Sequence, residues 1–364
     1  MASGPLRVGV IGANPSYGWS PRTHLPALSA LPEFELTAVC TAHQETADAS
    51  AKAFGAKMAF NDYREMVKHP DIDVVAVVVK VPQHYELTMA ALNAGKHVYT
   101  EWPLGASLAQ SEEMADLAKR QGLRTMIGLQ GRRSAALLRM KELVAEGYVG
   151  EVVSATMTQF NGGVLTRTSD RTWQADVAAG ANTLTITFGH AIDGVCNTLG
   201  EFAQVSSVVS TQVNQWLETD TGRTIDVTSP DNVLISGRLK SGAVASAHLA
   251  FVPHLGSKHG TEIYGRDGTL VLSNGSGTQF GNSQLFGAKA GDDQLKEIET
   301  NEPEWITDLE LTGPAMNVAK MWRDFGEAIA NGTAVNPDFD AAVARHKLIA
   351  AIEKASATGV AQTL

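Results

Sequence analysis

LRVGVIGANPSYGW, residues 6–19, is an apolar β-strand pattern that runs directly into a glycine-containing turn. Gly12 at the end of the strand permits a tight turn, and Gly18 near the start of the next helix lets backbone N–H groups approach a phosphate. Asn14 stands where the usual G-x-G-x-x-G pattern has its middle glycine, and the loop is longer than usual. Because the turn opens a series of alternating strands and helices, it predicts a dinucleotide-binding site.

The first 130 residues alternate short β-branched runs with amphipathic stretches, which is typical of βαβ units in a parallel sheet. The predicted strands span 6–11, 35–41, 57–60, 74–81, 98–100 and 125–129, and the predicted helices span 46–54, 63–68, 85–94 and 107–121. Residues 74–79 are continuously apolar, as expected of a central strand that helices cover on both faces. Asp62 and Ser107 are the expected N-caps of two of these helices. The pattern predicts a Rossmann doubly wound parallel sheet over residues 1–130.

After a predicted helix at 135–146 the pattern changes to longer alternating runs, at 152–160, 205–213, 233–239, 244–251 and 269–272. These runs predict an open, mostly antiparallel sheet, interrupted by one helix at 183–199 and followed by helices at 315–330 and 340–358. Residues 274–305 are rich in Gly, Ser, Asn and Asp, which favours loops. We therefore expect an α+β domain for substrate binding and oligomerisation over residues 131–364, with its last helices as candidates to pack on the first domain.

Composition limits the functional classes. At about 150 residues per domain, 364 residues predict two or three domains. The formal net charge of −10 disfavours nucleic acid and anionic membranes as partners. Cys40 and Cys196 are too far apart for a disulfide framework, and no H-E-x-x-H or similar pattern predicts a metal site. No leader and no apolar run of about 20 residues is evident, so we expect a cytoplasmic location.

The end of the second predicted strand bears on cofactor choice. An NAD-specific site usually carries an acidic residue there, which accepts a hydrogen bond from the ribose 2′-hydroxyl. This chain has Thr41-Ala42-His43 instead, which leaves room for a 2′-phosphate but offers no adjacent arginine. The sequence therefore predicts that the cofactor is NADP or NAD, with a lean toward NADP. The alternative is that Thr41 and His43 are ordinary loop residues with no role in cofactor choice.

Further motifs follow in order along the chain. They lie at 81–85 (VPQHY), 94–98 (AGKHV), 101–104 (EWPL), 132–133, 147–150, 173–182, 189–193 and 338–341. In this order they resemble the glucose-fructose oxidoreductase, inositol dehydrogenase and MocA family over nearly the whole chain. The resemblance implies a Rossmann domain, a second domain whose open sheet packs against a partner subunit, and the oxidation or reduction of sugars, polyols and related carbonyl compounds.

The sequence departs from the family pattern at two catalytic positions. Family enzymes carry Glu-Lys-Pro where this chain has Glu101-Trp102-Pro103, so Trp102 replaces the lysine. The family pattern also has an aspartate four residues before a histidine, and this chain has Ile186 at that position. The histidine itself, His190, is retained. The segments 12–19, 101–104, 129–132 and 187–190 more closely resemble a narrower branch that includes a fungal galactose-pathway transcriptional repressor, which binds a nicotinamide dinucleotide.

Position in the sheet and in the family pattern assigns the remaining cofactor residues. Strand ends at 81–84, 101–102 and 130 face the expected crevice, and Trp102 would lie beside the nicotinamide. The predicted cofactor-binding residues are Gly12, Asn14, Gly18, Trp19, Thr41, His43, Val81, Pro82, His84, Glu101, Trp102 and Gln130.

Catalytic candidates come from one helix and one strand end. If 183–199 is a single α-helix, His190 and Asp193 share the side opposite its apolar stripe. The carboxylate would then fix the imidazole tautomer for general acid/base work, whereas a solvated face with a chance pair is the alternative. Lys80 ends an apolar strand, where it either approaches the ligand crevice or reaches solvent along a buried stem. Family position adds Arg132, Gln159, Asn161 and Trp173 as candidate substrate residues.

The first functional hypothesis is an NAD(P)(H)-dependent oxidoreductase that acts on a small-molecule sugar, polyol or related compound, in a homo-oligomer built through the second-domain sheet. Two alternatives stay open. Trp102 and Ile186 are compatible with a non-catalytic dinucleotide-binding regulator or sensor, and the broader family also includes redox-neutral lyases or hydrolases that recycle the cofactor in place.

Overall fold

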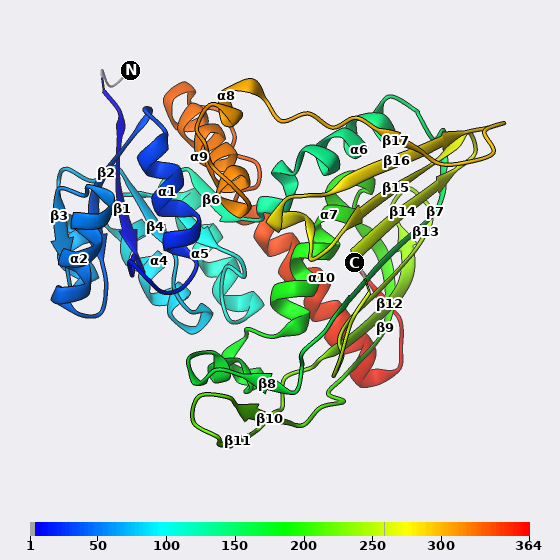
Figure 1. Cartoon of the computed structure of the whole chain (residues 1–364), viewed down its shortest axis with the longest axis horizontal. Coiled ribbons are helices and arrows are strands. Elements are labelled where there is room, and N and C mark those ends of the chain that lie inside the picture. The colour runs from blue at the N-terminus through cyan, green and yellow to red at the C-terminus, as the bar shows by residue number, and fades with distance from the viewer. Residues whose placement is uncertain (1–3, 258) are drawn as a thin grey trace. The chain divides into compact units, whose positions relative to one another are not determined.

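The computed structural model describes residues 4–257 and 259–364 (Figure 1). By internal contacts the chain forms two compact units. The first consists of the chain up to Gln130 together with Glu302–Ala344, and the second of Gly131–Asn301 together with Arg345–Leu364. The helices of the chain's C-terminal part are therefore divided between the units.

The first unit contains a six-stranded, all-parallel sheet in the order β3-β2-β1-β4-β5-β6. The strands are β1 Leu6–Ile11, β2 Phe34–Cys40, β3 Met58–Phe60, β4 Val74–Val77, β5 His97–Glu101 and β6 Thr125–Gly128. This topology confirms the predicted Rossmann doubly wound sheet. The prediction that the central strand continues to residue 81 is wrong, because the chain leaves the sheet after Val77 and turns into the short helix η2, Val81–Gln83.

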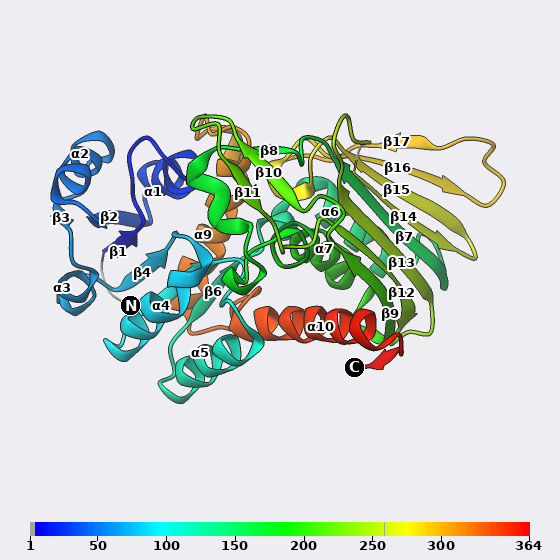
Figure 2. The same cartoon turned by 90° about the horizontal axis from the view of Figure 1, so that it is seen from below.

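Helices cover both faces of this sheet. Figure 2 shows α1 and α2 on one side and α3, α4 and α5 on the other. The bounds are η1 Ser20–Arg22, α1 His24–Ala30, α2 Gln44–Phe54, α3 Tyr63–Lys68, α4 His84–Asn93, α5 Leu108–Arg120, α8 Glu304–Thr307 and α9 Pro314–Asn331. The N-caps are as predicted: Asp62 accepts from Arg64 N–H, and Ser107 accepts from Gln110 N–H. Residues of α9 join α1 and the strands in one buried apolar core, which includes Trp322 and Phe325.

The second unit is built on a nine-stranded sheet in the order β17-β16-β15-β14-β7-β13-β12-β9-β18. Among the strand pairs that the described residues form in this sheet, only β7–β13 is parallel, so the predicted mostly antiparallel sheet is confirmed. The bounds are β7 Val152–Asn161, β9 Phe202–Ser210, β12 Asn232–Leu239, β13 Val244–Phe251, β14 His259–Gly265, β15 Gly268–Asn274, β16 Gln284–Lys289, β17 Lys296–Ile298 and β18 Gln362–Thr363. The expectation of loops throughout 274–305 is wrong, because β16 and β17 lie there and extend the sheet beside β15.

One face of this sheet packs against helices. Figure 1 shows α6 and α7 along it, with α10 beside them. The bounds in this part are η3 Gln130–Arg133, α6 Ala135–Ala145, η5 Val177–Ala179, η6 Thr183–Phe188, α7 Gly189–Leu199, η7 Thr278–Phe280 and α10 Phe339–Thr358. The predicted single helix at 183–199 is two segments, because η6 is a π-helix. Its i→i+5 hydrogen bonds make a wider turn than an α-helix, so a uniform helical projection does not apply across both.

A small three-stranded sheet, absent from the sequence predictions, completes the second unit. Its order is β11-β10-β8, with bounds β8 Thr166–Arg167, β10 Gln215–Glu218 and β11 Thr224–Asp226. The helix η4, Ser169–Gln174, follows β8 directly. Trp216 on β10 is buried with Ala175 and Val227 in a separate small cluster beneath this sheet.

In the part of the chain that the structure describes, no helix is both long enough and apolar enough to cross a lipid bilayer.

A buried histidine on β14 gives a prediction for stability. His259 is 2% exposed, and neither ring nitrogen has a hydrogen-bond partner among residues 4–257 and 259–364. Burial lowers the pKa of His259 to about 4. In the unfolded chain this histidine has a pKa of about 6.5, so between pH 6.5 and 4 the unfolded chain binds a proton that the folded chain excludes. The contribution of the neutral ring to the unfolding free energy is therefore complete above pH 6.5 and is lost as the pH falls toward 4.

When the pH falls from 6.5 to 4, the unfolding free energy of the parent should fall by about 3 kcal/mol more than that of the His259→Leu variant, which has no ring to protonate. Urea titrations followed by tryptophan fluorescence across this pH range measure the difference. His254→Leu, which removes an exposed ring from the preceding connection, is the control. Equal pH dependence in the parent and His259→Leu would show that the buried ring does not contribute.

Candidate functional site

The residues predicted to contact the cofactor follow the carboxyl ends of five strands in the first unit. Residues 12–19 follow β1, residues 41–43 follow β2, residues 81–84 follow β4, residues 101–102 are at the end of β5, and Gln130 follows β6. Because the strands are parallel, the structure brings these residues to one edge of the sheet. Ligands of doubly wound sheets bind outside this edge, where the strand order reverses, which here is between β1 and β4.

The turn after β1 has room for backbone but not for a side chain. Gly12 has φ +88°, and a Cβ at this position would lie 2.1 Å from the carbonyl oxygen of Val78 beyond β4. The Gly12 N–H donates to the carbonyl of Cys40 at 2.9 Å, so the turn is also fixed to the end of β2. Gly18 has φ +92°. A bare backbone where the strand order reverses fits the pyrophosphate of a dinucleotide.

Two residues of this turn stabilise the protein itself. The Asn14 side-chain oxygen accepts from the N–H groups of Ser16 and Tyr17, each at 3.0 Å, so it organises the loop that replaces the usual glycine spacing. Trp19 is half-buried and packs against the apolar core of the first unit. The single turn η1 follows the loop, and α1 then starts at His24.

The end of β2 presents hydroxyl and imidazole groups. Thr41 is buried; its Oγ1 donates to the His43 carbonyl at 2.8 Å and lies 2.5 Å from Oγ1 of Thr46. His43 is exposed and immediately precedes α2. The first acidic residue of α2 is Glu45, so the segment 41–44 contains no carboxylate for a ribose 2′-hydroxyl.

Glu101 is a buried carboxylate at the end of β5. Its Oε1 accepts from His24 Nε2 at 2.8 Å, and its two oxygens accept from Gln130 Nε2 at 2.8 and 2.7 Å. Trp322 Nε1 donates to Nδ1 of His24 at 3.1 Å, which requires a lone pair on Nδ1 and therefore assigns the proton to Nε2. Gly128 leaves room for the carboxylate, since a Cβ there would lie 2.6 Å from Oε1.

The remaining residues of this edge are packed or exposed as follows. Trp102 is buried, and the ring of His84 lies between the carbonyl oxygens of Pro103 at 2.7 Å and Val79 at 3.0 Å. Burial lowers the pKa of His84, and because a neutral imidazole carries one N–H, it can donate to only one of these two carbonyl oxygens at a time. The placement of Lys80 in an apolar strand is wrong, because Lys80 lies beyond β4 and is exposed. The cost of burying its ammonium, which made it a candidate, does not arise.

In the second unit, Asp193 on α7 is held by two arginines. Arg132 donates from Nε and Nη2 to the two carboxylate oxygens, each at 2.8 Å, and Arg345 Nε donates to Oδ1 at 3.3 Å. Arg345 also pairs with Glu201 at 2.8 Å. Burial raises the pKa of Asp193, but the charge and hydrogen bonds of Arg132, together with the charges of Arg345 and His190, outweigh this effect and keep the pKa below its ordinary value. The expectation that Asp193 lies away from the core is wrong, because these arginines supply the charge that permits its burial.

His190 is the second residue of α7 and is half-buried. Its charge also lowers the pKa of Asp193, so the two predicted catalytic groups are electrostatically coupled. The Arg132 fork, predicted to meet substrate, is occupied by Asp193. Arg345 was missed by the sequence predictions, although an arginine within the apolar pattern of 339–352 is a signal for a buried ion pair.

Two of the other substrate candidates lie together. Gln159 on β7 is buried, and its Nε2 donates to Asn161 Oδ1 at 3.3 Å and to the Ser276 carbonyl at 3.2 Å. Asn161 Nδ2 is buried and has no hydrogen-bond partner in the described ranges. Trp173 lies on the separate helix η4.

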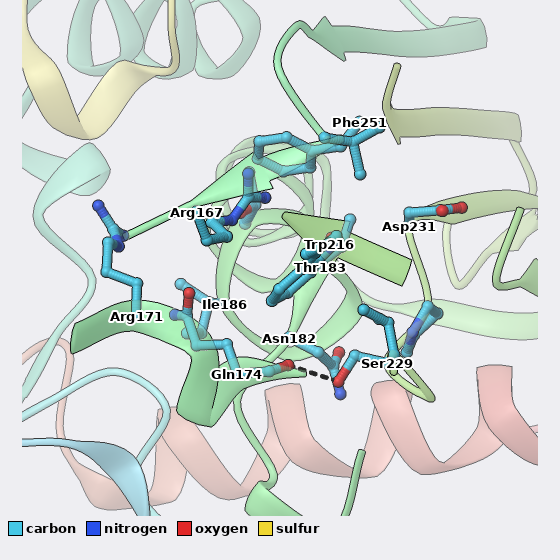
Figure 3. Close-up of a pocket in the computed structure, with 14 residues that line it drawn as sticks. Arg167, Arg171, Gln174, Asn182, Thr183, Ile186, Trp216, Ser229, Asp231 and Phe251 are labelled. Carbon is cyan, nitrogen blue, oxygen red and sulfur yellow. Dashed lines mark hydrogen bonds between the residues drawn. The ribbon is translucent and has the colours of Figure 1, made fainter. Parts of the chain in front are cut away.

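A pocket of about 270 Å³ lies among η4, η6 and the three-stranded sheet of the second unit. Figure 3 shows Arg167 in it, between Phe251 and Trp216. Arg171 lines it from η4, and Ile186 from η6. The sequence predictions missed the pocket because β8 and β10 are short. The paired arginines of TRTSDR, residues 166–171, are the signal that could have indicated it.

Comparisons with known proteins agree with this architecture. The oxidoreductase family with an NAD-binding Rossmann fold, GFO_IDH_MocA, matches residues 6–129, and the C-terminal domain of Gal80p matches residues 135–274. The dehydrogenase aclE of Aspergillus oryzae is 32% identical over 245 residues, which are 64% of this chain and 67% of that protein. The galactose/lactose metabolism regulatory protein GAL80 of Saccharomyces cerevisiae is 29% identical over 79% of this chain and 72% of its own.

A solved structure of levoglucosan dehydrogenase in complex with NADH is 25% identical to this chain, covers 99% of both chains, and has a TM-score of 0.85. The relatives thus include dehydrogenases as well as a regulatory protein. On this sequence and structural similarity, the chain belongs to the GFO/IDH/MocA family of NAD-binding oxidoreductases and carries a Gal80p-like C-terminal domain.

Proposed function

We propose that this protein is an NAD(P)(H)-dependent oxidoreductase that acts on a sugar, a polyol or a related carbonyl or hydroxyl compound. The observation that carries the proposal is the turn at Gly12, which has no room for a side chain and lies where the strand order of the sheet reverses, in a domain that matches an NAD-binding family. Similarity to levoglucosan dehydrogenase with NADH supports hydride transfer to or from a small polar substrate. The bound cofactor would supply the hydride chemistry.

The chain itself would bind, orient and exchange a proton. Gly12 and Gly18 would leave space for the pyrophosphate. The buried indole of Trp102 would exclude water, but it cannot exchange protons as a lysine does. His190 would take a proton from a substrate hydroxyl or give one to a carbonyl oxygen. Asp193, ionised between two arginines, would act as a positioning residue: it would hold α7 in place, and its negative charge would stabilise the protonated form of His190.

A dinucleotide-binding regulator is the second candidate. The 29% identity with GAL80 over 79% of this chain favours it, as does an indole at the position of the family lysine. A redox-neutral reaction that recycles the cofactor in place is a third candidate, and product formation without net change in cofactor redox state would identify it.

Substitution of His190 tests the enzyme proposal. Mixing the protein anaerobically with reduced cofactor and a panel of carbonyl compounds should give loss of nicotinamide absorbance. We expect the His190→Ala variant to turn over roughly 10²- to 10⁴-fold more slowly, because a positioned general acid or base contributes about that factor. Cofactor binding, followed by fluorescence, should be unchanged, and His254→Ala is the matched control.

Equal turnover by the His190→Ala variant would remove His190 from the mechanism. Tight cofactor binding without turnover of any panel member would contradict the enzyme proposal and favour the regulator, whose capture of a protein partner should then depend on the cofactor.

We propose a preference for NADP(H) over NAD(H), because the segment after β2 carries Thr41 and exposed His43 and no carboxylate. The Thr41→Asp variant should bind NADPH at least about tenfold more weakly, since a buried carboxylate would repel a 2′-phosphate, while binding of NADH should hold or improve. Thr41→Asn, of similar size and uncharged, is the control. Titration of both reduced cofactors by fluorescence measures this, and a parent that prefers NADH would contradict the proposal.

We propose a homo-oligomer formed through the nine-stranded sheet. The support is that Val208, Leu234, Val244 and Tyr264, on strands β9, β12, β13 and β14, are 60%, 42%, 54% and 41% exposed on the sheet face opposite the helices. Sedimentation equilibrium should find a dimer or larger assembly for the parent and a monomer for Leu234→Glu. Leu217→Glu on the small sheet is the control, and a parent that is monomeric at micromolar concentration would refute the proposal.

A further inference from the structure

The pocket of the second unit contains two cations and no carboxylate that neutralises them. Arg167 and Arg171 both line it, and within residues 4–257 and 259–364 neither guanidinium is ion-paired. We propose that this pocket binds an oxyanion, a carboxylate or phosphate, carried by a monosaccharide-sized ligand. The inference rests on the proposed function in naming this ligand as the substrate, whereas the binding itself does not depend on turnover.

Arg167 is held in place before any ligand arrives. Its Nη1 donates to the carbonyls of Gly163 and Thr166, each at 2.8 Å. Its guanidinium carbon lies 4.7 Å from the Trp216 ring centroid and 5.8 Å from that of Phe251. The Nε–Nη2 edge, which pairs with carboxylate or phosphate in a bidentate manner, donates to no carboxylate among the described residues. Fixing the fork in advance lowers the entropy cost of binding.

The local electrostatics favour an anion. Burial lowers the pKa of Arg167, and the nearby charge of Arg171 lowers it further, so an anion between them would relieve both desolvation and repulsion. Asp231 is the carboxylate on the wall of the pocket, but its oxygens accept from the backbone N–H groups of Gln212 at 2.9 and 3.0 Å and Val213 at 2.7 Å.

Other groups indicate the size and nature of the ligand. Trp216 is 6% exposed, and its Nε1 has no acceptor within the described ranges, so the wall holds an unused donor. Thr183, Ile186 and Thr187 line the pocket from η6, the segment that leads into α7 and His190. A volume of about 270 Å³ suits a single sugar ring. An aromatic wall, hydroxyls and a fixed cationic fork together indicate an acidic sugar: a uronate, an aldonate or a sugar phosphate.

Calorimetric titration without cofactor tests the binding. Hexuronates, hexonates and hexose phosphates should each be compared with the parent neutral hexose, and inorganic phosphate and acetate serve as anion-only probes. We expect at least one acidic sugar to bind roughly tenfold or more tightly than its neutral parent, with affinity that falls as salt is added. Comparison of the carboxylate and phosphate arms identifies the oxyanion.

Two variants locate the site. Arg167→Gln and Arg171→Gln should each weaken the acidic ligand by roughly 10- to 100-fold and leave the neutral sugar unchanged. The Arg167→Lys variant keeps the charge but loses the planar guanidinium, so its affinity for the acidic ligand should be as low as that of Arg167→Gln. Because Arg167 packs on Trp216, exposed Arg171 provides the variant least coupled to folding. Arg238→Gln, an exposed arginine of β12, is the control.

The outcomes separate the two proposals. If both arginine variants abolish binding of the acidic ligand and the parent shows no turnover with any nicotinamide cofactor, the proposed anion pocket is supported and the proposed oxidoreductase is contradicted. Turnover of neutral sugars at rates that the arginine variants do not change supports the oxidoreductase and overturns the acidic ligand. Failure of every acidic probe to bind at millimolar concentration also overturns it.

Discussion

The buried carboxylate of Glu101 is the constraint on which the cofactor edge of the first unit depends. A buried carboxylate is costly unless donors surround it, and here the donors come from separate segments: His24 on α1 and Gln130 after β6. Trp322 fixes the orientation of His24 from α9, nearly 300 residues further along the chain. The carboxylate thus fixes the ends of β5 and β6, the start of α1 and the late helix that belongs to this unit.

The second unit solves a similar problem with guanidinium groups. Asp193 is buried on α7, and its partners Arg132 and Arg345 come from η3 and α10. Removal of one partner from such a group leaves an uncompensated buried charge, typically at a cost of about 3–5 kcal/mol. The clamp therefore positions the helix that carries His190, and it also occupies the Arg132 fork. The proton chemistry of the proposed reaction then falls on His190, because Asp193 is held ionised.

Most of the fold follows from local pattern. β1 was predicted residue for residue, and the β13 strand likewise, because continuous or alternating apolar runs bounded by turns are strong local signals. The errors have long-range causes. The helical projection puts Asp193 on the polar side of its helix, because it cannot show that Arg132 and Arg345, which lie 61 and 152 positions away, bury that side. Lys80 was placed in a strand because the apolar run outlasts the hydrogen-bonded ladder. β16 and the small β8–β10–β11 sheet were missed because pairing partners, rather than composition, create them.

The two departures from the family pattern affect different steps. Trp102 removes a proton-exchanging amine near the expected nicotinamide but leaves hydride transfer possible, since that requires proximity and exclusion of water rather than a cation. Ile186 removes a carboxylate from a wall that also contains Arg167 and Arg171, so their charge is left for a ligand. A regulator that only senses a dinucleotide has no need of a fixed cationic fork in a pocket that is also lined by η6, the segment leading to His190. An enzyme for an acidic sugar does, because the fork can orient the ring while His190 exchanges the proton. The substitutions are therefore more consistent with altered substrate chemistry than with loss of catalysis.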